Sequence, residues 1–385
     1  MHIGVVTEYY YPTLGGVQEH VHHFAKEALS RGHSLKIITS NIKDLSDDGS
    51  FVDDIPIERI GIGIPIHQNG SIARVTLAPG LGSKLKNIFE REKFDIIHIH
   101  SPLTPTLPIL ALINSNTVTV GTFHTNFKGS GFFKIFQKPC QRYLYRLDGL
   151  IAVSKTAVNA LEKYFEADYK VIPNGIDTEK YNPSVPPLPE FNDGKTNLLW
   201  VGRIEPRNGL DRMIKAFSFA SAKRNDLRLI IVGDGPLRKS CEILVPARLK
   251  TNVHFAGFIN AERPSYYSSA NMLCVPATIS SFGITLLEGM AAGKPIVASN
   301  IDGFTDVMTQ DLEGLLVDTA DPREFAEAIL KIANDKELAG RYGAAGLKTA
   351  SKYSWPVVTT QILDYYEVAK SRFQRRREQA DPNAF

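Results

Sequence analysis

Cysteine is scarce in this chain, which has three cysteines in 385 residues. They are Cys140, Cys241 and Cys274, and no two of them have the C-x-x-C spacing of a metal or redox motif. This pattern excludes a small domain held together by disulfides and argues against a zinc ribbon. We expect three reduced thiols with structural roles in a cytosolic protein.

Long apolar segments and an excess of one charge are also missing. The chain opens directly on a short apolar strand, without the basic region and apolar core of a signal peptide. No apolar segment approaches the roughly 20 residues that are needed to cross a bilayer. A net charge of only +3 argues against a protein that coats nucleic acid. We expect a cytoplasmic protein, either dissolved or bound peripherally to the inner face of the membrane.

Two signatures of nucleotide chemistry are absent. The sequence contains no Asp-x-Asp, so no metal tether for a nucleotide diphosphate is indicated. The first strand-to-helix connection lacks G-x-G-x-x-G, which argues against an NAD-dependent oxidoreductase. Several histidines invite a metal reading, but no cysteine or carboxylate pattern accompanies them, so structural roles are favoured and no metal is predicted. These histidines are His20, His22, His23, His98 and His100.

What the chain does contain is short apolar runs that alternate with helical patterns, and its length suits two domains. Such alternation predicts parallel β-α-β units and therefore an α/β fold with two doubly wound, Rossmann-like domains. The predicted domains are residues 1–178 and 179–355, joined near the Pro-rich stretch 183–189, and residues 356–385 form a last helix and a basic tail. The predicted strands are 3–6, 35–38, 96–99, 118–123, 150–153, 198–201, 229–232, 253–255, 272–275, 296–298 and 315–317.

The segment 280–299 predicts a helix that begins after a strand and a glycine-containing turn. Its unpaired N–H groups and helix dipole suit a phosphate, and Glu288, one turn further, is an acceptor for a sugar diol. An ordinary strand-loop-helix unit with Glu288 as a surface carboxylate remains an alternative at this point.

Three further positions lie where parallel sheets bind ligands, at strand ends. Arg203 follows the strand 198–201, and its guanidinium suits a diphosphate. Gly15 and Gly16 follow the first strand and allow backbone to approach a phosphate or a sugar, although a plain turn explains them equally well. His124 closes the strand 118–123; a lone histidine is more often structural than catalytic.

The sequence as a whole resembles the retaining glycosyltransferases of family GT4, and within them the bacterial phosphatidylinositol mannosyltransferases. The matching stretches are 15–18, 69–74, 95–100, 123–125, 172–177 and 282–299. The resemblance implies a GT-B fold: two Rossmann-like domains face each other across a cleft, and a C-terminal helix crosses back to the first. It also implies that the first domain binds the acceptor and the second binds a nucleotide sugar.

The resemblance assigns roles to individual residues. It places His124 beside the transferred sugar as the catalytic residue. The donor would contact Gly16, Arg203, Asn208, Ser280, Phe282, Gly283, Ile284 and Glu288. The acceptor side would be lined by Gln18, Arg74 and Thr125.

Two positions depart from the family pattern. Ser280 stands where the family has a Glu that holds the donor sugar, and Asn208 stands where it has a Lys that contacts the diphosphate. Two hypotheses follow. The chain is a retaining transferase with an altered donor site, moving a hexose, with mannose first, from a GDP- or UDP-sugar to a lipid-linked or polyol acceptor. Alternatively, it is a non-catalytic or weakly active binding protein of the same fold.

Basic and aromatic residues interleave at 132–138 and 142–146, and a mixed-charge helix at 84–93 adds further cations. Such stretches suit an anionic membrane surface, with rings at the headgroup level. A buried aromatic helix edge with solvated charges explains them as well. The expected partners are therefore a nucleotide sugar, a lipid or polyol acceptor and an anionic membrane surface, with no nucleic acid and a monomeric chain.

Overall fold

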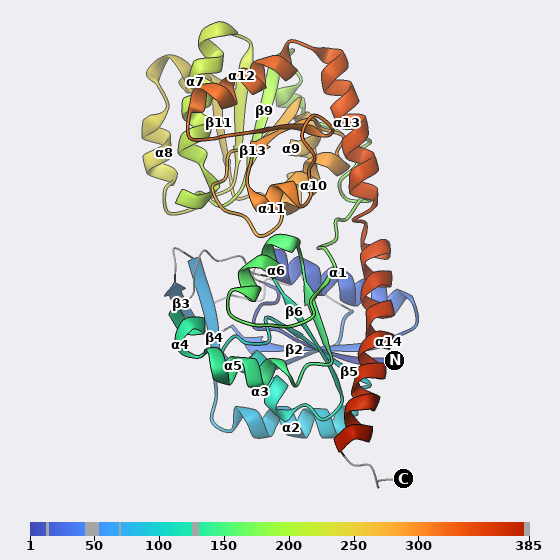
Figure 1. Cartoon of the computed structure of the whole chain (residues 1–385). Coiled ribbons are helices and arrows are strands. Elements are labelled where there is room, and N and C mark those ends of the chain that lie inside the picture. The colour runs from blue at the N-terminus through green and yellow to red at the C-terminus, as the bar shows by residue number, and fades with distance from the viewer. Residues whose placement is uncertain (13–14, 43–53, 69–70, 125–130, 381–385) are drawn as a thin grey trace. The chain divides into compact units, whose positions relative to one another are not determined.

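The computed structural model describes residues 1–12, 15–42, 54–68, 71–124 and 131–380, and the chain divides into two compact units. Unit 1 comprises Met1–Gly175 and Trp355–Phe385, and unit 2 comprises Ile176–Ser354. The predicted boundaries at 178 and 355 lie close to these limits, and the last segment packs as part of unit 1. Figure 1 labels the elements of both units.

Unit 1 is built on an eight-stranded sheet in the order β4-β3-β2-β1-β5-β6-β7-β8. Neighbouring strands are parallel except β3 and β4, which form an antiparallel hairpin at the sheet edge. The sequence analysis did not predict this hairpin. The strands are β1 (His2–Val6), β2 (Ser34–Asn41), β3 (Ile57–Gln68), β4 (Ser71–Leu77), β5 (Ile96–His100), β6 (Val118–Phe123), β7 (Gly149–Ala152) and β8 (Lys170–Val171).

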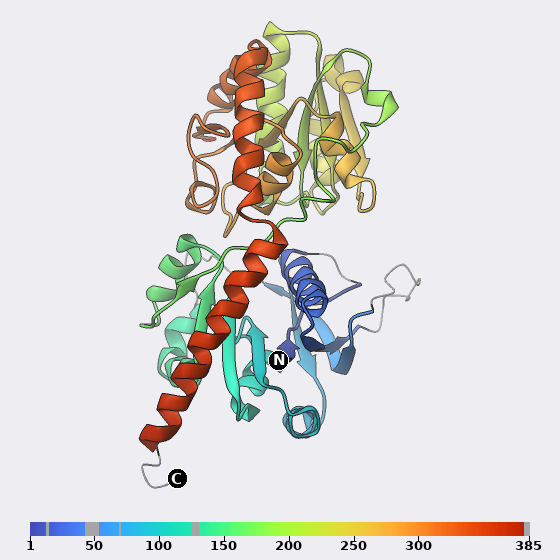
Figure 2. The ribbon, with the colours of Figure 1, turned by 90° about the vertical axis from the view of Figure 1, so that its right-hand side faces the viewer.

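Helices cover the sheet of unit 1, and the last helix of the chain is among them. They are α1 (Gly16–Ser30), α2 (Leu81–Glu92), α3 (Leu107–Asn114), α4 (Gly131–Ile135), α5 (Gln137–Leu144), α6 (Lys155–Glu162) and α14 (Trp355–Ala380). The apolar residues of α14 recur at helical spacing, and Trp355, Val358, Ile362 and Tyr366 are buried in one core with β1 and α1. Figure 2 shows α14 running across the strands of this unit. The predicted return of the terminal helix to the first domain is therefore confirmed.

Unit 2 has a six-stranded, wholly parallel sheet in the order β11-β10-β9-β12-β13-β14. The strands are β9 (Thr196–Val201), β10 (Leu227–Val232), β11 (Val253–Gly257), β12 (Met272–Val275), β13 (Ile296–Ser299) and β14 (Gly314–Val317). The helices are α7 (Leu210–Lys223), α8 (Arg238–Leu244), α9 (Arg263–Ser269), α10 (Ile284–Ala291), α11 (Asp302–Thr305), α12 (Pro322–Ala333) and α13 (Lys336–Ser351), with 3-10 turns η1 (Pro189–Phe191), η2 (Pro206–Asn208) and η3 (Ala247–Asn252).

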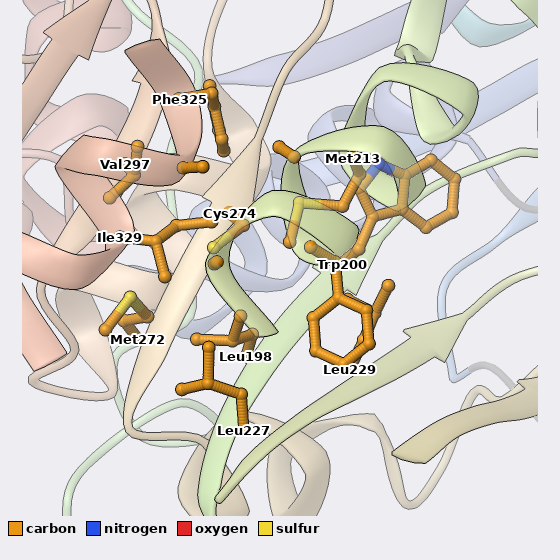
Figure 3. Close-up of a cluster of buried hydrophobic side chains, with 14 of the residues drawn as sticks. Leu198, Trp200, Met213, Leu227, Leu229, Met272, Cys274, Val297, Phe325 and Ile329 are labelled. Atoms are coloured by element: carbon orange, nitrogen blue, oxygen red, sulfur yellow. The ribbon is translucent and has the colours of Figure 1, made fainter. Parts of the chain in front are cut away.

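The core of unit 2 explains why its strands are near-continuous apolar runs. Both faces of a parallel sheet are covered, so every side chain of β10, β12 and β13 is buried, whereas the edge strand β11 is partly exposed. On one face Trp200 and Leu198 of β9 pack against Met213 of α7 and Ile329 of α12, as Figure 3 shows. Cys274 belongs to the same cluster, and all three cysteines are buried and unpaired.

The strand order places a topological switch point in each unit. In unit 1 the chain winds outward in both directions from β1 and β5, and in unit 2 from β9 and β12. Ligands of open parallel sheets bind outside the carboxyl ends of the strands at such points. The fold therefore directs attention to the loops after β1, β5, β6, β9 and β12.

Membrane-spanning segments were sought among the helices of the described ranges. Each of those helices is too short or too polar to pass through a bilayer.

Candidate functional site

The loop after β9 carries two arginines that share one buried carboxylate. Glu205 is 3% exposed, whereas the side chains of Arg203 and Arg207 are 49% and 54% exposed. Nε of Arg203 lies 3.7 Å from Oε2 of Glu205, and Nε of Arg207 lies 2.5 Å from Oε1. Both guanidinium groups thus contact Glu205 through Nε and remain about half-exposed to solvent at the carboxyl end of β9.

Asn208, a predicted donor contact, is used inside this loop. Its side-chain amide donates to the carbonyl oxygen of Arg203 at 2.8 Å, and its own carbonyl accepts from the Trp200 indole N–H at 3.3 Å. The next residue, Gly209, has a φ of 69°, and a Cβ there would collide with the carbonyl oxygen of Pro276. The loop after β9 is therefore fixed in shape and packed against the loop after β12.

The loop after β12 leads into α10, and several of the predicted donor residues lie on it. The amide of Thr278 donates to the carbonyl of Arg207 at 2.8 Å, which joins the two loops at the switch point. The Ser280 hydroxyl donates to the carbonyl of Phe282 at 2.5 Å, and Phe282 itself is buried. Gly283 is the N-cap of α10 and provides no side-chain cap to the first N–H groups, which begin at Ile284. Those amides form the positive end of the helix dipole.

Glu288 is buried in unit 2, at 5% exposure, so its reading as a surface carboxylate is wrong. Arg263 donates from Nη2 to Oε1 at 2.9 Å, and the hydroxyl of Tyr267 donates to Oε2 at 2.5 Å. Arg263 also donates from Nε to the hydroxyl of Tyr181 at 2.7 Å. We call Tyr181, Arg263, Tyr267 and Glu288 the carboxylate network.

The charges in the carboxylate network depend on one another. The negative charge of Glu288 raises the pKa of Arg263 above its usual range. Burial, and then the charge of Glu288, raises the pKa of Tyr267 and of Tyr181, so both hydroxyls remain protonated donors. Glu288 accepts from Arg263 and Tyr267 and also interacts with the hydroxyl of Tyr181, whereas a carboxylate has about four acceptor positions. Glu288 thus retains capacity to accept from the hydroxyls of a ligand.

In unit 1 three histidines from different elements converge. His20 of α1, His100 at the end of β5 and His124 just after β6 have ring nitrogens that all lie within 4.8 Å of one another. Nδ1 of His100 lies 2.8 Å from Nε2 of His124, and Nδ1 of His20 lies 2.9 Å from Oδ1 of Asn174. We call His20, His100 and His124 the histidine cluster. The sequence analysis named all three but did not predict that they meet.

The histidine cluster is electrically neutral. Burial lowers the pKa of His20 to about 4, and burial lowers the pKa of His100 and of His124 well below the ordinary histidine value. His98, next to His100, is engaged at both ring nitrogens by Tyr366 and Thr122, and burial lowers its pKa to about 3. The facing nitrogens of His100 and His124 form an N–H···N hydrogen bond. That bond uses one lone pair of the cluster, whereas Nε2 of His20 and Nε2 of His100 have no hydrogen-bond partner within the described ranges. The spacing of the three rings would allow them to hold a metal ion.

The remaining predicted residues of unit 1 are distributed over two elements. Gly16 and Gln18 lie in the first turns of α1, the helix that carries His20; Gly16 is exposed and Gln18 is buried. Arg74 lies on β4, at the sheet edge, where its backbone N–H donates to the hydroxyl of Tyr9 at 3.2 Å. Tyr9, in the loop after β1, thereby ties the edge strand to the switch-point loop. Thr125 falls outside the described residues.

Several polar residues of these sites were missed by sequence reasoning. Glu8, directly after β1, is buried and accepts from the backbone N–H groups of Thr106 and Leu107 at 3.0 and 2.8 Å and from the Thr76 hydroxyl. Burial raises the pKa of Glu8 even though these bonds oppose the shift. Arg263 and Tyr267 carry a readable signal, because they are four residues apart and share one face of α9. Glu8 has no such local signal.

Comparison with known proteins links both units to one family. Residues 14–180 match the model described as "Glycosyltransferase Family 4", and residues 186–349 match "Glycosyl transferases group 1". The chain is 32% identical to a phosphatidyl-myo-inositol mannosyltransferase of Mycobacterium leprae over 95% of this chain and 96% of that protein. It is 33% identical to the protein of that name in Mycolicibacterium smegmatis, over 95% and 94%.

Solved structures share the fold at lower identity. Anabaena Alr3699/HepE, crystallised in complex with UDP, superimposes with a TM-score of 0.77 at 19% identity, over 95% of this chain and 100% of that one. A glycosyltransferase from Rickettsia africae gives 0.76 at 18% identity, over 96% and 98%. These similarities confirm the predicted α/β fold with two parallel-sheet domains, the GT-B fold.

Proposed function

This chain belongs to the family 4 glycosyltransferases, and we propose that it transfers mannose from a nucleotide-diphosphate sugar to a phosphatidylinositol-like acceptor with retention of configuration. The choice of sugar and acceptor follows the name of the relatives that are 30–33% identical over nearly the whole chain. UDP-bound structures of the same fold support a nucleotide donor, with UDP or GDP as the candidate carriers.

The observation that carries this proposal is the placement of the carboxylate network and of Arg203 around the switch point of unit 2. The guanidinium of Arg203 and the first amides of α10 would neutralise the diphosphate, since both provide donors and positive potential. Glu288, held by Arg263 and Tyr267, would accept from the ribose hydroxyls. Ser280 and Phe282 lie on the loop just before α10 and would contact the donor there.

The chemistry requires no nucleophile from the protein. In the proposed step the bond between the anomeric carbon and the diphosphate oxygen breaks, and an acceptor hydroxyl attacks from the same face. The proton of that hydroxyl passes to the departing diphosphate. Arg203 would stabilise the negative charge that develops on the leaving group. Neutral His124 would hydrogen-bond a hydroxyl of the transferred sugar, since its depressed pKa keeps it unprotonated.

An acceptor embedded in a membrane requires an enzyme that reaches the lipid surface. The stretch from α4 to the turn after α5 exposes Ile135 and Tyr145, at 76% and 67%, and includes Lys138, Arg142 and Arg146. Exposed rings and aliphatic groups with neighbouring cations suit an anionic headgroup layer. We propose that this part of unit 1 binds the membrane surface peripherally, with the chain acting as a monomer.

The proposal is tested with the purified whole chain. GDP-mannose, UDP-glucose and other nucleotide sugars are offered with phosphatidylinositol vesicles or with free inositol, and nucleotide release and product mass are measured. We expect release that depends on the acceptor and a product in which NMR shows the anomeric configuration of the donor. An inverted product would contradict retention, and transfer to free inositol alone would contradict a lipid acceptor.

A non-catalytic binding protein is the second candidate, and the two departures from the family pattern favour it. The hydroxyl of Ser280 is engaged by the carbonyl of Phe282, and the amide of Asn208 by that of Arg203. Nucleotide-sugar binding with no transfer from any donor, followed by gain of transfer in Ser280→Glu, would establish this candidate and overturn the first.

A further inference from the structure

We propose that Arg207, and not Asn208, supplies the second positive charge that binds the diphosphate of the donor. The inference rests on the proposed nucleotide-sugar function and concerns which side chains of this particular chain carry it out. The position that matches the family Lys is Asn208, and Arg207 is the residue before it.

The first support is how Arg207 is held. Its Nε lies 2.5 Å from Oε1 of Glu205, the carboxylate that also anchors Arg203 through Nε. Among the described residues, the terminal nitrogens of Arg207 have no hydrogen-bond partner. Nε of Arg207 is hydrogen-bonded to Glu205, and Nε of Arg203 forms a longer ion pair with it. The outer edge of each guanidinium is therefore available for two parallel bonds to phosphate oxygens.

The second support is that Asn208 is committed elsewhere. Its side chain donates to the carbonyl of Arg203, and its backbone carbonyl accepts from Trp200, so the residue closes the 3-10 turn η2. Asparagine is also too short to replace the reach of a lysine and carries no charge. A polar side chain that holds its own loop together does not provide the missing ammonium.

The third support is the position of Arg207 next to the loop that begins α10. Its backbone carbonyl accepts from the N–H of Thr278 at 2.8 Å and from the Thr278 hydroxyl at 3.3 Å. Arg207 is therefore fixed to the segment that continues into Gly283 and the first amides of α10. Both arginines and that helix start belong to adjacent loops at one switch point, which is where a diphosphate would need them.

The shared carboxylate has a consequence for the charge of the loop. Glu205 and the two arginines together carry a net charge of about +1. The negative charge of Glu205 offsets the repulsion between the two guanidinium groups, so both can lie in one loop. A ligand with a single phosphate group would need only one of the two arginines. The arrangement thus predicts that Arg207 matters for ligands with a second phosphate and much less for ligands with one.

The experiment is calorimetric titration of the whole chain with nucleotides that differ by one phosphate, UDP against UMP and GDP against GMP. In the wild-type chain we expect the diphosphate to bind more tightly. Arg207→Ala should weaken diphosphate binding about tenfold, about 1.4 kcal/mol, and change monophosphate binding less than about twofold. Asn208→Ala should cost less than about threefold, and Arg341→Ala, an exposed arginine on α13, provides the matched control with no effect.

The outcomes distinguish a failure of the Arg207 assignment from a failure of the proposed nucleotide-sugar function. A wild-type chain that binds neither UDP nor GDP overturns the proposed function, and the inference falls with it. Diphosphate binding that Asn208→Ala weakens more than Arg207→Ala overturns the inference alone, as does an Arg207→Ala effect that is equal for mono- and diphosphates. Thermal unfolding of each variant shows whether it is still folded. Arg207→Lys keeps the positive charge and should recover part of the affinity that Arg207→Ala loses.

Discussion

The two switch points of this molecule occupy the same place in similar folds but hold opposite kinds of buried polar groups. In unit 1 the histidine cluster is neutral, and its members bond to one another and to Asn174. In unit 2 the carboxylate network contains an ion pair, and Glu205 forms ion pairs with Arg203 and Arg207. Fixed charges suit the phosphates of a nucleotide, whereas neutral imidazoles suit sugar hydroxyls. Under the proposed function, the ionic groups of unit 2 would bind the nucleotide and the neutral histidines of unit 1 would bind sugar hydroxyls.

The difference also predicts how each half fails. A buried ion pair contributes little net stability, yet removal of one partner leaves an unpaired buried charge and is costly. A neutral network fails when one member acquires a charge, because protonation of a buried imidazole must overcome desolvation. Unit 2 should therefore be sensitive to single substitutions, and unit 1 to acid. The chain provides a reporter for each, since its two tryptophans are Trp200 in unit 2 and Trp355 in unit 1.

The largest effect should come from Glu288→Ala, which leaves Arg263 buried without its carboxylate. We expect unit 2 to lose about 3–5 kcal/mol of stability and nucleotide binding to disappear. The measurement is urea unfolding followed by Trp200 fluorescence in a Trp355→Phe background. The double variant Arg263→Met, Glu288→Leu is the control: it should recover stability but not nucleotide binding. Recovery of both would mean that the network serves only the fold.

Acid should destabilise unit 1 next most strongly. The folded pKa of His20 is about 4 and the unfolded value is 6.5, so between these values only the unfolded chain takes up the proton. Stability is then complete above the unfolded pKa and falls as the pH decreases toward the folded one. For His20 alone the loss is up to about 3 kcal/mol.

This acid effect is measured by urea unfolding at several pH values with Trp355 as the reporter, in a Trp200→Phe background. Trp355 lies against His20, with ring centroids 5.2 Å apart, so the probe is local. His20→Asn removes one titrating ring and should reduce the pH dependence. If His254→Asn, which removes an exposed histidine of unit 2, reduced the pH dependence as much as His20→Asn does, the assignment of the effect to the cluster would be contradicted.

Arg203→Ala should weaken binding of a nucleotide diphosphate by about tenfold to a hundredfold, because an exposed guanidinium bound to phosphate contributes about 1.5–3 kcal/mol. Stability should hardly change, since the side chain is half-exposed. Calorimetry of the variant beside Arg341→Ala checks both expectations. An unchanged affinity would show that Arg203, in the loop after β9, does not bind the nucleotide.

The smallest effect should come from Tyr267→Phe, which removes one hydrogen bond to Glu288 and leaves the Arg263 contact intact. We expect a loss of about 1–2 kcal/mol in the stability of unit 2. Relative to the wild-type chain, the variant should lose more affinity for nucleosides that carry a ribose than for their 2′,3′-dideoxy forms. If both nucleosides bind the variant as they bind the wild-type chain, Tyr267 does not orient Glu288.

Much of the fold was predictable because periodicity is a local signal. The buried parallel strands and the helical spacing from Trp355 onward gave the two sheets and the returning helix. The β3–β4 hairpin was missed although isoleucines alternate from Ile60 to Ile66, because the intervening positions are Gly61, Gly63 and Pro65 and such residues are unusual inside a strand. Resemblance to the family, and not periodicity, identified Arg203 and Glu288 as candidates.

The contacts that give the sites their chemistry were beyond prediction. Glu288 and Arg263 lie 25 residues apart, and His20 meets residues 100 and 124 only because α1 packs against the ends of β5 and β6. Neither pairing leaves a trace in composition or spacing. The hydrogen bond from the Asn208 amide to the carbonyl of Arg203 was not predictable from the sequence either.

The division of charge between the units is tested most directly by titrating nucleotide diphosphate, without acceptor, into the whole chain and into three variants. The account predicts that His124→Ala binds UDP or GDP within about twofold of the wild-type chain, whereas Glu288→Gln and Arg203→Ala each lose about tenfold or more. Loss of nucleotide affinity in His124→Ala, with the two unit 2 variants unaffected, would contradict it.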